Sequence, residues 1–417
     1  MSSDKKKILA IVTWYPTKEN PWAGSFFKEQ CELLSQKYDI TLLKIGYFNK
    51  LGIKYFFKRI SGKDIAINDI GLSSVFTEKQ VDIIRPSELA LQNNLLSRYN
   101  IRKKGIAGVG IVDCEAEKNF WRKHMTRLVN ILGEKYDLVY GMSAQGTAVY
   151  ASLLAQELGV PYILSEHSPF LIPGSSMSDT FKDAMEGASS FLAISNDKIR
   201  QILMQNIKLR NIVYIGNIID EEKFKCEPQS HDDKTFLIVA SHSFYKNYDL
   251  FIKAMNRLTE LATKPFKVII AGYGANKGYS QGVDEFVKKI ENSRFYDRSE
   301  MIPSVSRDEI SALYNRADAF VMTSIQEGQP VAAIEATASG LPVFSTRCGG
   351  VEDYLDEKMG RIVPVLDYEA LANHMNDFLD GKVTYDSGYI RNTVISKFGR
   401  EAFCRNFDRI IGEVIGE

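Results

Sequence analysis

The sequence has little cysteine and no excess charge of either sign, and each shortage excludes a class of protein. Five cysteines in 417 residues stand far apart and form no C-x-x-C pair. This spacing argues against a disulfide framework and a thiolate zinc site, and it favours a reducing compartment. Lysine plus arginine and aspartate plus glutamate both number 52, so the charge balance indicates no polyanionic partner such as nucleic acid.

Long apolar runs are also absent. No stretch approaches the roughly 18 apolar residues of a membrane-spanning helix. The N-terminal run resembles the start of a signal peptide, but Trp14, Tyr15 and Pro16 interrupt it after about five residues, and a signal sequence needs at least about seven. We therefore expect a cytoplasmic protein, and any membrane attachment would be peripheral, at the inner face of the cell membrane.

What the sequence does contain is a regular alternation of strand and helix patterns. In the first half the expected strands cover residues 7–13, 39–45, 137–141, 161–166 and 190–194. Helical spacing of apolar residues falls between them, over 25–38, 119–132, 147–158 and 179–186. The second half continues with strands at 235–241 and 266–271 and a helix at 248–261. The alternation predicts doubly wound parallel sheets, and 417 residues make two domains the default.

Residues 317–354 form the clearest unit of this alternation. A short apolar strand over 318–324 leads into Gly328, where the chain can turn sharply. Pro330 then takes the first position of a helix, Gly340 marks the end of that helix, and the next strand covers 341–346. Such a helix points its N-terminus out of the carboxyl edge of a parallel sheet, where its N–H groups suit a phosphate.

Two carboxylates frame this anion site. Glu327 lies in the loop before the helix and Glu335 in its second turn, and a Gly349-Gly350 turn follows the next strand. Near a phosphate, a carboxylate is better suited to accept hydrogen bonds from sugar or ribose hydroxyls than to bind the phosphate itself. The alternative is that both glutamates only favour the helix N-terminus electrostatically. The pair together with the glycines and Pro330 favours the functional interpretation.

Other residues follow predicted strands at the edge where open α/β sheets bind ligands. Gly24 opens a helix after the first strand and its loop, a second candidate anion site, although many α/β proteins begin in this way. His167 follows another strand, and a lone histidine is more often structural. Lys246 ends a loop after a strand of the second half, where it can neutralise a diphosphate or simply be a solvated surface lysine.

Residues 47–63 interleave cations with large apolar side chains. The cations are Lys50, Lys54, Lys58, Arg59 and Lys63. A basic, aromatic helix of this kind can lie on an anionic membrane surface. It can equally be a helix packed in the core with solvated lysines, and the sequence does not decide between the two.

The stretch from 317 to 354 resembles the E-x(7)-E signature of the retaining family-4 glycosyltransferases, and the segments TRCGGVEDYL and GRIVPV are similar to that family too. The resemblance implies the GT-B fold, an α/β fold in which two doubly wound Rossmann-like domains face a central cleft and a C-terminal helix crosses back. It implies an acceptor-side N-terminal domain (1–212), a hinge (213–234), a nucleotide-sugar-binding domain (235–390) and a terminal helix packing on the first domain (391–417).

The resemblance also implies roles for individual residues. Glu327 and His167 would contact the donor sugar, Glu335 the nucleotide ribose and Lys246 the diphosphate leaving group, and three of these, Glu327, His167 and Lys246, would be catalytic. The implied donor-binding residues are Gly24, Ser241, Lys246, Gly272, Gly274, Ile302, Gly328, Gln329, Pro330, Val331 and Glu335.

The sequence departs from the family pattern at two positions. Met142 stands where family members often carry a histidine, so a contact made there by others is missing. Ser241 stands where an arginine usually accompanies the lysine that Lys246 matches. This second departure weakens the leaving-group assignment and makes the neighbouring His242 a candidate partial substitute.

The resemblance implies a retaining, metal-independent hexosyltransferase without a cofactor. It would move a hexose-type sugar from a nucleotide-diphosphate sugar to a saccharide or lipid-linked saccharide, in cell-surface polysaccharide or glycolipid assembly. The absence of a D-x-D pair at any strand end agrees with metal independence. Two alternatives remain. A GT-B nucleotide-sugar epimerase would need acid and base groups, and a non-catalytic nucleotide-sugar-binding protein would keep Glu335 without needing Glu327.

Overall fold

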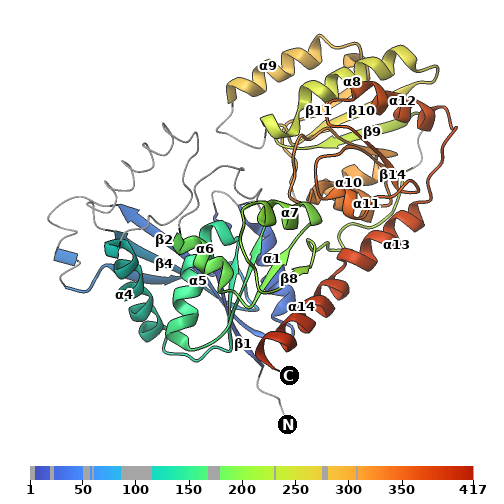
Figure 1. Cartoon of the computed structure of the whole chain (residues 1–417). Helices are drawn as coiled ribbons and strands as arrows, with labels where there is room; N and C mark the ends of the chain where they lie inside the picture. Colours follow the sequence, from blue (N-terminus) through green and yellow to red (C-terminus); the bar gives the residue numbers. More distant parts are fainter. Residues whose placement is uncertain are drawn as a thin grey trace. The chain divides into compact units, whose positions relative to one another are not determined.

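The computed structural model describes residues 5–18, 23–49, 57–58, 61–85, 115–167, 179–229, 232–274, 280–306 and 309–416. The chain forms two compact units, each built around its own sheet (Figure 1). Unit 1 comprises Met1–Ile194, Lys198–Ile215 and Cys404–Glu417. Unit 2 comprises Ser195–Asp197 and Gly216–Phe403.

The sheet of unit 1 has the strand order β3-β4-β2-β1-β5-β6-β7-β8. Its strands are β1 (Lys7–Val12), β2 (Asp39–Asn49), β3 (Ile65–Asp69), β4 (Thr77–Arg85), β5 (Leu138–Met142), β6 (Tyr162–Glu166), β7 (Ser190–Ala193) and β8 (Ile212–Tyr214). Strand β3 is antiparallel to β4, and the other neighbouring strands are parallel. The helices described around this sheet include α1 (Ser25–Leu34), α4 (Glu115–Leu132), α5 (Ala144–Leu158), α6 (Asp179–Glu186) and α7 (Asn196–Met204), of which α7 begins in residues of unit 2.

Helices cover both faces of this sheet because alternate strand residues point to opposite sides. On one face α4, α5 and α6 bury the predicted apolar stripe of α4, including Trp121, against strand residues such as Leu9 and Val139. On the other face α1 brings Cys31 Sγ to 4.0 Å from Met142 Sδ. The predicted buried stripe of α4 is therefore confirmed, whereas α7 was not predicted.

The terminal apolar stretch forms two helices rather than the single helix predicted over 391–417. Helix α13 (Ser387–Phe398) ends before Gly399, and α14 (Arg400–Ile415) follows it. The residues of α14 from Cys404 onward belong to unit 1. There the ring of Phe407 lies 5.7 Å from that of Tyr140 and 5.9 Å from that of Tyr38.

The sheet of unit 2 has the order β11-β10-β9-β12-β13-β14, and every neighbouring pair is parallel. Its strands are β9 (Lys234–Val239), β10 (Phe266–Ala271), β11 (Ser299–Ile302), β12 (Ala319–Met322), β13 (Val343–Thr346) and β14 (Gly360–Val363). Its helices include α8 (Tyr248–Leu261), α9 (Ser280–Glu291), α10 (Ile310–Asn315), α11 (Val331–Ala338) and α12 (Tyr368–Leu379). Because all pairs are parallel, the carboxyl ends of the six strands lie at one edge.

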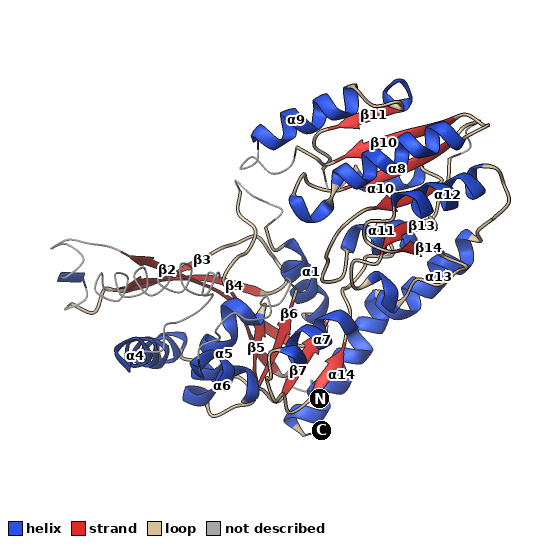
Figure 2. Cartoon of the chain, turned by 45° about the horizontal axis from the view of Figure 1, so that its top comes forward, coloured by secondary structure: helices blue, strands red, loops and turns tan. Residues whose placement is uncertain are grey.

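Helices pack on both faces of this second sheet. Helices α8 and α12 lie side by side (Figure 2) and share a core with alternate residues of the strands, among them Phe236, Val268 and Val321. Helix α11 packs against α10 and α13 outside that core. The prediction of an α/β protein with two parallel-sheet domains is confirmed.

Two local expectations are wrong. Strand β2 continues to Asn49, paired with β4, so residues 47–49 do not begin a helix. Residues 50–56 and 59–60 of the predicted membrane-binding segment lie outside the described residues. Pro330 precedes α11 as its N-cap, with φ −72° and ψ 106°, instead of taking its first helical position.

Within the described ranges, no helix is long and apolar enough to cross a bilayer.

Candidate active site

The predicted donor-binding residues of unit 2 gather at the carboxyl edge of its sheet. Ser241 and Lys246 follow β9, Gly272 and Gly274 follow β10, Ile302 ends β11, and Glu327 to Val331 follow β12. Backbone hydrogen bonds join neighbouring loops of this edge. The His242 N–H donates to Tyr273 O at 3.1 Å, and the Gly272 N–H donates to Ile302 O at 2.9 Å. The topology therefore brings these loops together as the sequence predicted.

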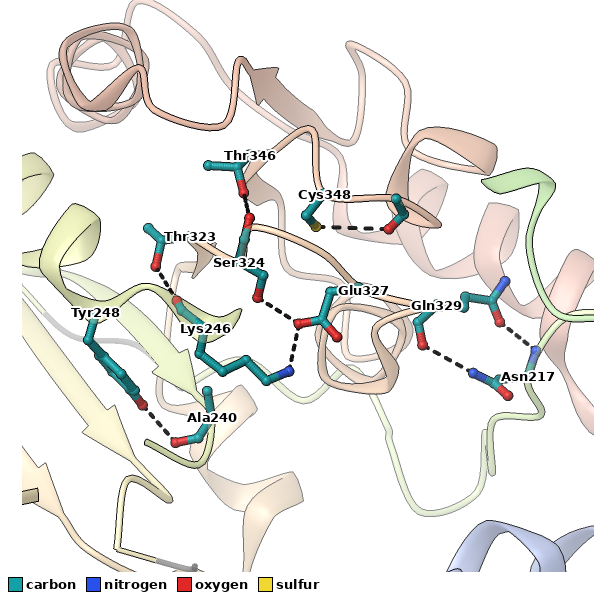
Figure 3. Close-up of polar contacts among 11 residues, drawn as sticks. Asn217, Ala240, Lys246, Tyr248, Thr323, Ser324, Glu327, Gln329, Thr346 and Cys348 are labelled. Atoms are coloured by element: carbon teal, nitrogen blue, oxygen red, sulfur yellow. Dashed lines mark hydrogen bonds and ion pairs between the residues drawn. The ribbon is translucent and has the colours of Figure 1, made fainter. Parts of the chain in front are cut away.

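At the centre of this edge, Lys246 and Glu327 form an ion pair. Lys246 Nζ lies 2.6 Å from Glu327 Oε1, and Ser324 Oγ donates to the same oxygen at 2.6 Å (Figure 3). The two charged side chains are 29% and 14% exposed. A phosphate that binds Lys246 must therefore compete with Glu327 for the ammonium group.

Hydroxyl groups at the strand ends fix the loops that carry this pair. Thr323 Oγ1 donates to Lys246 O at 3.1 Å, and Thr346 Oγ1 donates to Ser324 O at 2.6 Å (Figure 3). Ser324, Thr323 and Thr346 were not predicted from the sequence. The available signal was their position, at the carboxyl ends of β12 and β13 beside the predicted site.

The loop before α11 is held by residue 217. The Asn217 N–H donates to Gln329 Oε1, and Asn217 Nδ2 donates to Gln329 O at 3.1 Å (Figure 3). Pro330 has neither an N–H nor a side chain that could cap α11. The N-terminus of α11 therefore has no side-chain cap, and it follows β12 directly after Glu327, which is the position that an anion site requires.

The turn after β13 closes against the same loop. Gly350 has φ +75°, and a Cβ at this position would lie 2.7 Å from Gln329 Cα and 2.8 Å from Gly328 O. The Glu327 N–H donates to Cys348 O at 2.7 Å. Only glycine fits this turn without displacing the loop that carries Glu327.

Glu335 lies on α11 with only 4% of its surface exposed. Tyr314, at the end of α10, donates its Oη–H toward Glu335 Oε2 at 2.9 Å. The sequence analysis missed Tyr314 because a tyrosine in the apolar stripe of a helix looks like an ordinary core residue.

His242, the candidate partial substitute for the missing arginine, packs among aromatic rings. Its ring lies 5.8 Å from that of Tyr248 and 5.4 Å from that of Phe286. Burial lowers the pKa of His242 from its usual value near 6.5, Lys289 lowers it further, and Asp249 opposes the shift. These surroundings disfavour the charged form of His242, and its role as a partial substitute stays a prediction.

In unit 1, Gly24 and His167 lie close to the same aromatic cluster. Gly24 is the N-cap of α1 with φ +68°, and the rings of Phe26 and Phe27, which follow it, lie 4.7 and 5.5 Å from that of His167. The His167 N–H donates to Glu166 Oε1 at 2.8 Å. The sequence analysis missed Glu166, a buried carboxylate at the end of β6. The roles of Gly24 and His167 toward a donor stay predictions.

Comparison with known proteins agrees with this arrangement. Residues 219–393 match the model of the family described as "Glycosyl transferases group 1". The phosphatidylinositol N-acetylglucosaminyltransferase gpi3 subunit of Schizosaccharomyces pombe is 25% identical over 263 residues, which are 61% of this chain and 56% of that protein. The chain spans about half the length of the curated relatives it matches.

Two solved structures share the whole fold. A glycosyltransferase from Rickettsia africae superposes with a TM-score of 0.68 at 17% identity, covering 100% of both chains. Anabaena HepE, solved in complex with UDP and glucose, has a TM-score of 0.64 at 14% identity, covering 98% of this chain and 100% of that one. The fold is therefore the GT-B fold of glycosyltransferases, as predicted.

Proposed function

We propose that this chain is a retaining glycosyltransferase that moves a hexose-type sugar from a nucleotide-diphosphate sugar to a saccharide or lipid-linked saccharide. The observation that carries the proposal is the gathering of Lys246, Glu327, Glu335 and the N-terminus of α11 at one sheet edge. The match to group 1 glycosyltransferases over residues 219–393 supports it. So does the relative named as an N-acetylglucosaminyltransferase subunit.

The charges of this edge suit cleavage of the bond between the sugar C1 and the diphosphate. Negative charge grows on the leaving phosphate, and fixed cations and N–H dipoles stabilise it. Lys246 would supply the cation, and the N–H groups at the start of α11 would supply the dipoles. The Glu327 carboxylate accepts hydrogen bonds from the sugar, which becomes positively charged in the transition state. The acceptor hydroxyl attacks the same face of C1 and gives its proton to the departing phosphate, so no covalent nucleophile is needed.

Incubation with a panel of nucleotide sugars, with and without saccharide acceptors, tests this function. We expect release of nucleoside diphosphate that depends on acceptor, and a product with the anomeric configuration of the donor by NMR. Conversion of the donor to its epimer would instead indicate an epimerase. Donor binding without any release would indicate a non-catalytic binding protein.

Replacing Glu335 with alanine is expected to weaken nucleoside diphosphate binding. A lost hydrogen bond to a charged group costs about 1.5–3 kcal/mol, which corresponds to about a 10- to 150-fold higher Kd. Isothermal titration calorimetry with UDP, GDP and ADP measures this change in Kd. Equal affinities of Glu335→Ala and the wild type for the nucleotide that binds would contradict the ribose assignment.

We also propose that the acceptor is lipid-linked and is reached through residues 47–63. Each cation near an anionic surface contributes about 1 kcal/mol, and salt screens the attraction. We expect the protein to sediment with anionic vesicles at low salt, and a variant with Lys50, Lys54, Lys58, Arg59 and Lys63 changed to glutamine to stay in solution.

A control variant carries the same charge change on unit 2. In this variant five of the exposed lysines of unit 2 are changed to glutamine, namely Lys253, Lys264, Lys267, Lys288 and Lys358. This control should still sediment at low salt. If both variants sediment equally well, residues 47–63 do not hold the protein at the membrane.

A further inference from the structure

Tyr314 connects helix α10 to the carboxylate of Glu335. Its side chain is fully buried, and its Oη lies 2.9 Å from Glu335 Oε2 and 3.1 Å from Ala332 O. A phenol has a single hydrogen to donate, and the distance to Glu335 Oε2 is the shorter of the two. The hydrogen bond from Tyr314 therefore goes mainly to Glu335.

The position of this hydroxyl is fixed by packing. The ring of Tyr314 lies 5.9 Å from that of Phe224, in an edge contact, and 6.0 Å from that of Phe320. Phe320 belongs to β12, the strand that leads into the loop of Glu327. A buried aromatic side chain in such a cluster has one rotamer available to it. The phenol is therefore a rigid donor, whereas a glutamate has three rotatable side-chain bonds.

We propose that Tyr314 is a positioning residue that orients Glu335 for the ribose of the donor nucleotide. This inference rests on the proposed function, since it assumes that Glu335 binds ribose. The carboxylate offers about four acceptor sites, and the phenol occupies one of them at a fixed angle. The plane of the carboxylate is then held in one orientation, so it does not need to be ordered when a ribose hydroxyl binds.

The predicted effect is specific to the sugar of the nucleotide. Tyr314→Phe keeps the ring and its packing and removes only the hydroxyl. We expect the variant to bind nucleoside diphosphate about fivefold more weakly, the equivalent of one lost hydrogen bond. Inorganic pyrophosphate should bind unchanged, and the wild-type preference for ribo- over 2′-deoxy- and 3′-deoxynucleoside diphosphates should shrink in the variant.

Calorimetry on the full chain, with the nucleotide that the wild type binds, measures the nucleotide affinity of Tyr314→Phe against that of the wild type. Tyr162→Phe is the matched control, because Tyr162 also donates from a buried hydroxyl, to Ala184 O at 2.6 Å in unit 1. This control should lose a similar amount of stability by thermal melting and keep its nucleotide affinity. In the Glu335→Ala background, Tyr314→Phe should cause no further loss of nucleotide affinity.

Three outcomes would overturn the inference. They are unchanged nucleotide affinity of Tyr314→Phe, an equal loss for pyrophosphate, and a further loss in the Glu335→Ala background. Each would reduce Tyr314 to a structural residue while leaving the proposed function intact. A wild type that binds none of UDP, GDP and ADP would instead overturn the proposed function, and this inference with it.

Discussion

Changing Lys246 to alanine is expected to lower kcat for sugar transfer about 10²- to 10³-fold, the range found when one group that stabilises developing negative charge is removed. Lys246 is the cation that lies against Glu327 at the strand edge, and burial lowers the pKa of His242, which disfavours its charged form. With serine at position 241, the leaving phosphate depends more heavily on this lysine. Steady-state release of nucleoside diphosphate with saturating donor measures the effect.

The control for this change is Lys253→Ala, which removes an exposed lysine from α8 in the same unit. It should leave kcat unchanged. Thermal melting of both variants separates chemistry from folding, since Lys246→Ala also leaves the Glu327 carboxylate without its ion-pair partner. A kcat within about threefold of wild type for a folded Lys246→Ala protein would show that this lysine does not stabilise the leaving phosphate.

A second large effect is expected at Glu327, with opposite consequences for turnover and for binding. Glu327→Gln removes a negative charge beside a sugar that becomes positive in the transition state, so kcat should fall about a hundredfold. The same change frees Lys246 from a partner 2.6 Å away. Partly exposed ion pairs are worth about 0.2–1 kcal/mol, so nucleoside diphosphate should bind up to about fivefold more tightly.

Ser324→Ala provides the comparison. It removes the hydroxyl that donates to Glu327 Oε1 at 2.6 Å and keeps both charges of the pair. Its nucleotide affinity should therefore stay at the wild-type value, while kcat falls by less than in Glu327→Gln. Weaker nucleotide binding by Glu327→Gln than by wild type would show that Glu327 does not compete with the phosphate for Lys246.

Much of the fold follows from local sequence patterns. The expected helix over 248–261 and strand over 266–271 coincide with α8 and β10, because amphipathic spacing and β-branched runs act over a few residues. The errors arose where tertiary contacts decided the outcome. Strand β2 extends to Asn49 because β4 supplies backbone partners as far as Arg85. Helical periodicity continues through Gly399, but that residue is extended, with φ −61° and ψ 163°, and separates α13 from α14.

The candidate site was predictable at the level of loops and not at the level of side-chain contacts. Parallel strand order alone places Lys246 and Glu327 at one sheet edge. The ion pair between these two side chains depends on their rotamers, which the sequence does not predict. Tyr314 and Glu335 lie on two helices that are separated in the sequence by a strand and a loop. Local periodicity therefore does not predict the contact between them.

The pair of hydrogen bonds from Asn217 to Gln329 has a mechanical consequence. Asn217 stands two residues after Ile215, where the chain passes from unit 1 into unit 2, and it is bonded to the loop at the N-terminus of α11 through both its backbone and its side chain. The segment by which the chain enters unit 2 is therefore anchored directly to the loop proposed to bind the donor phosphates.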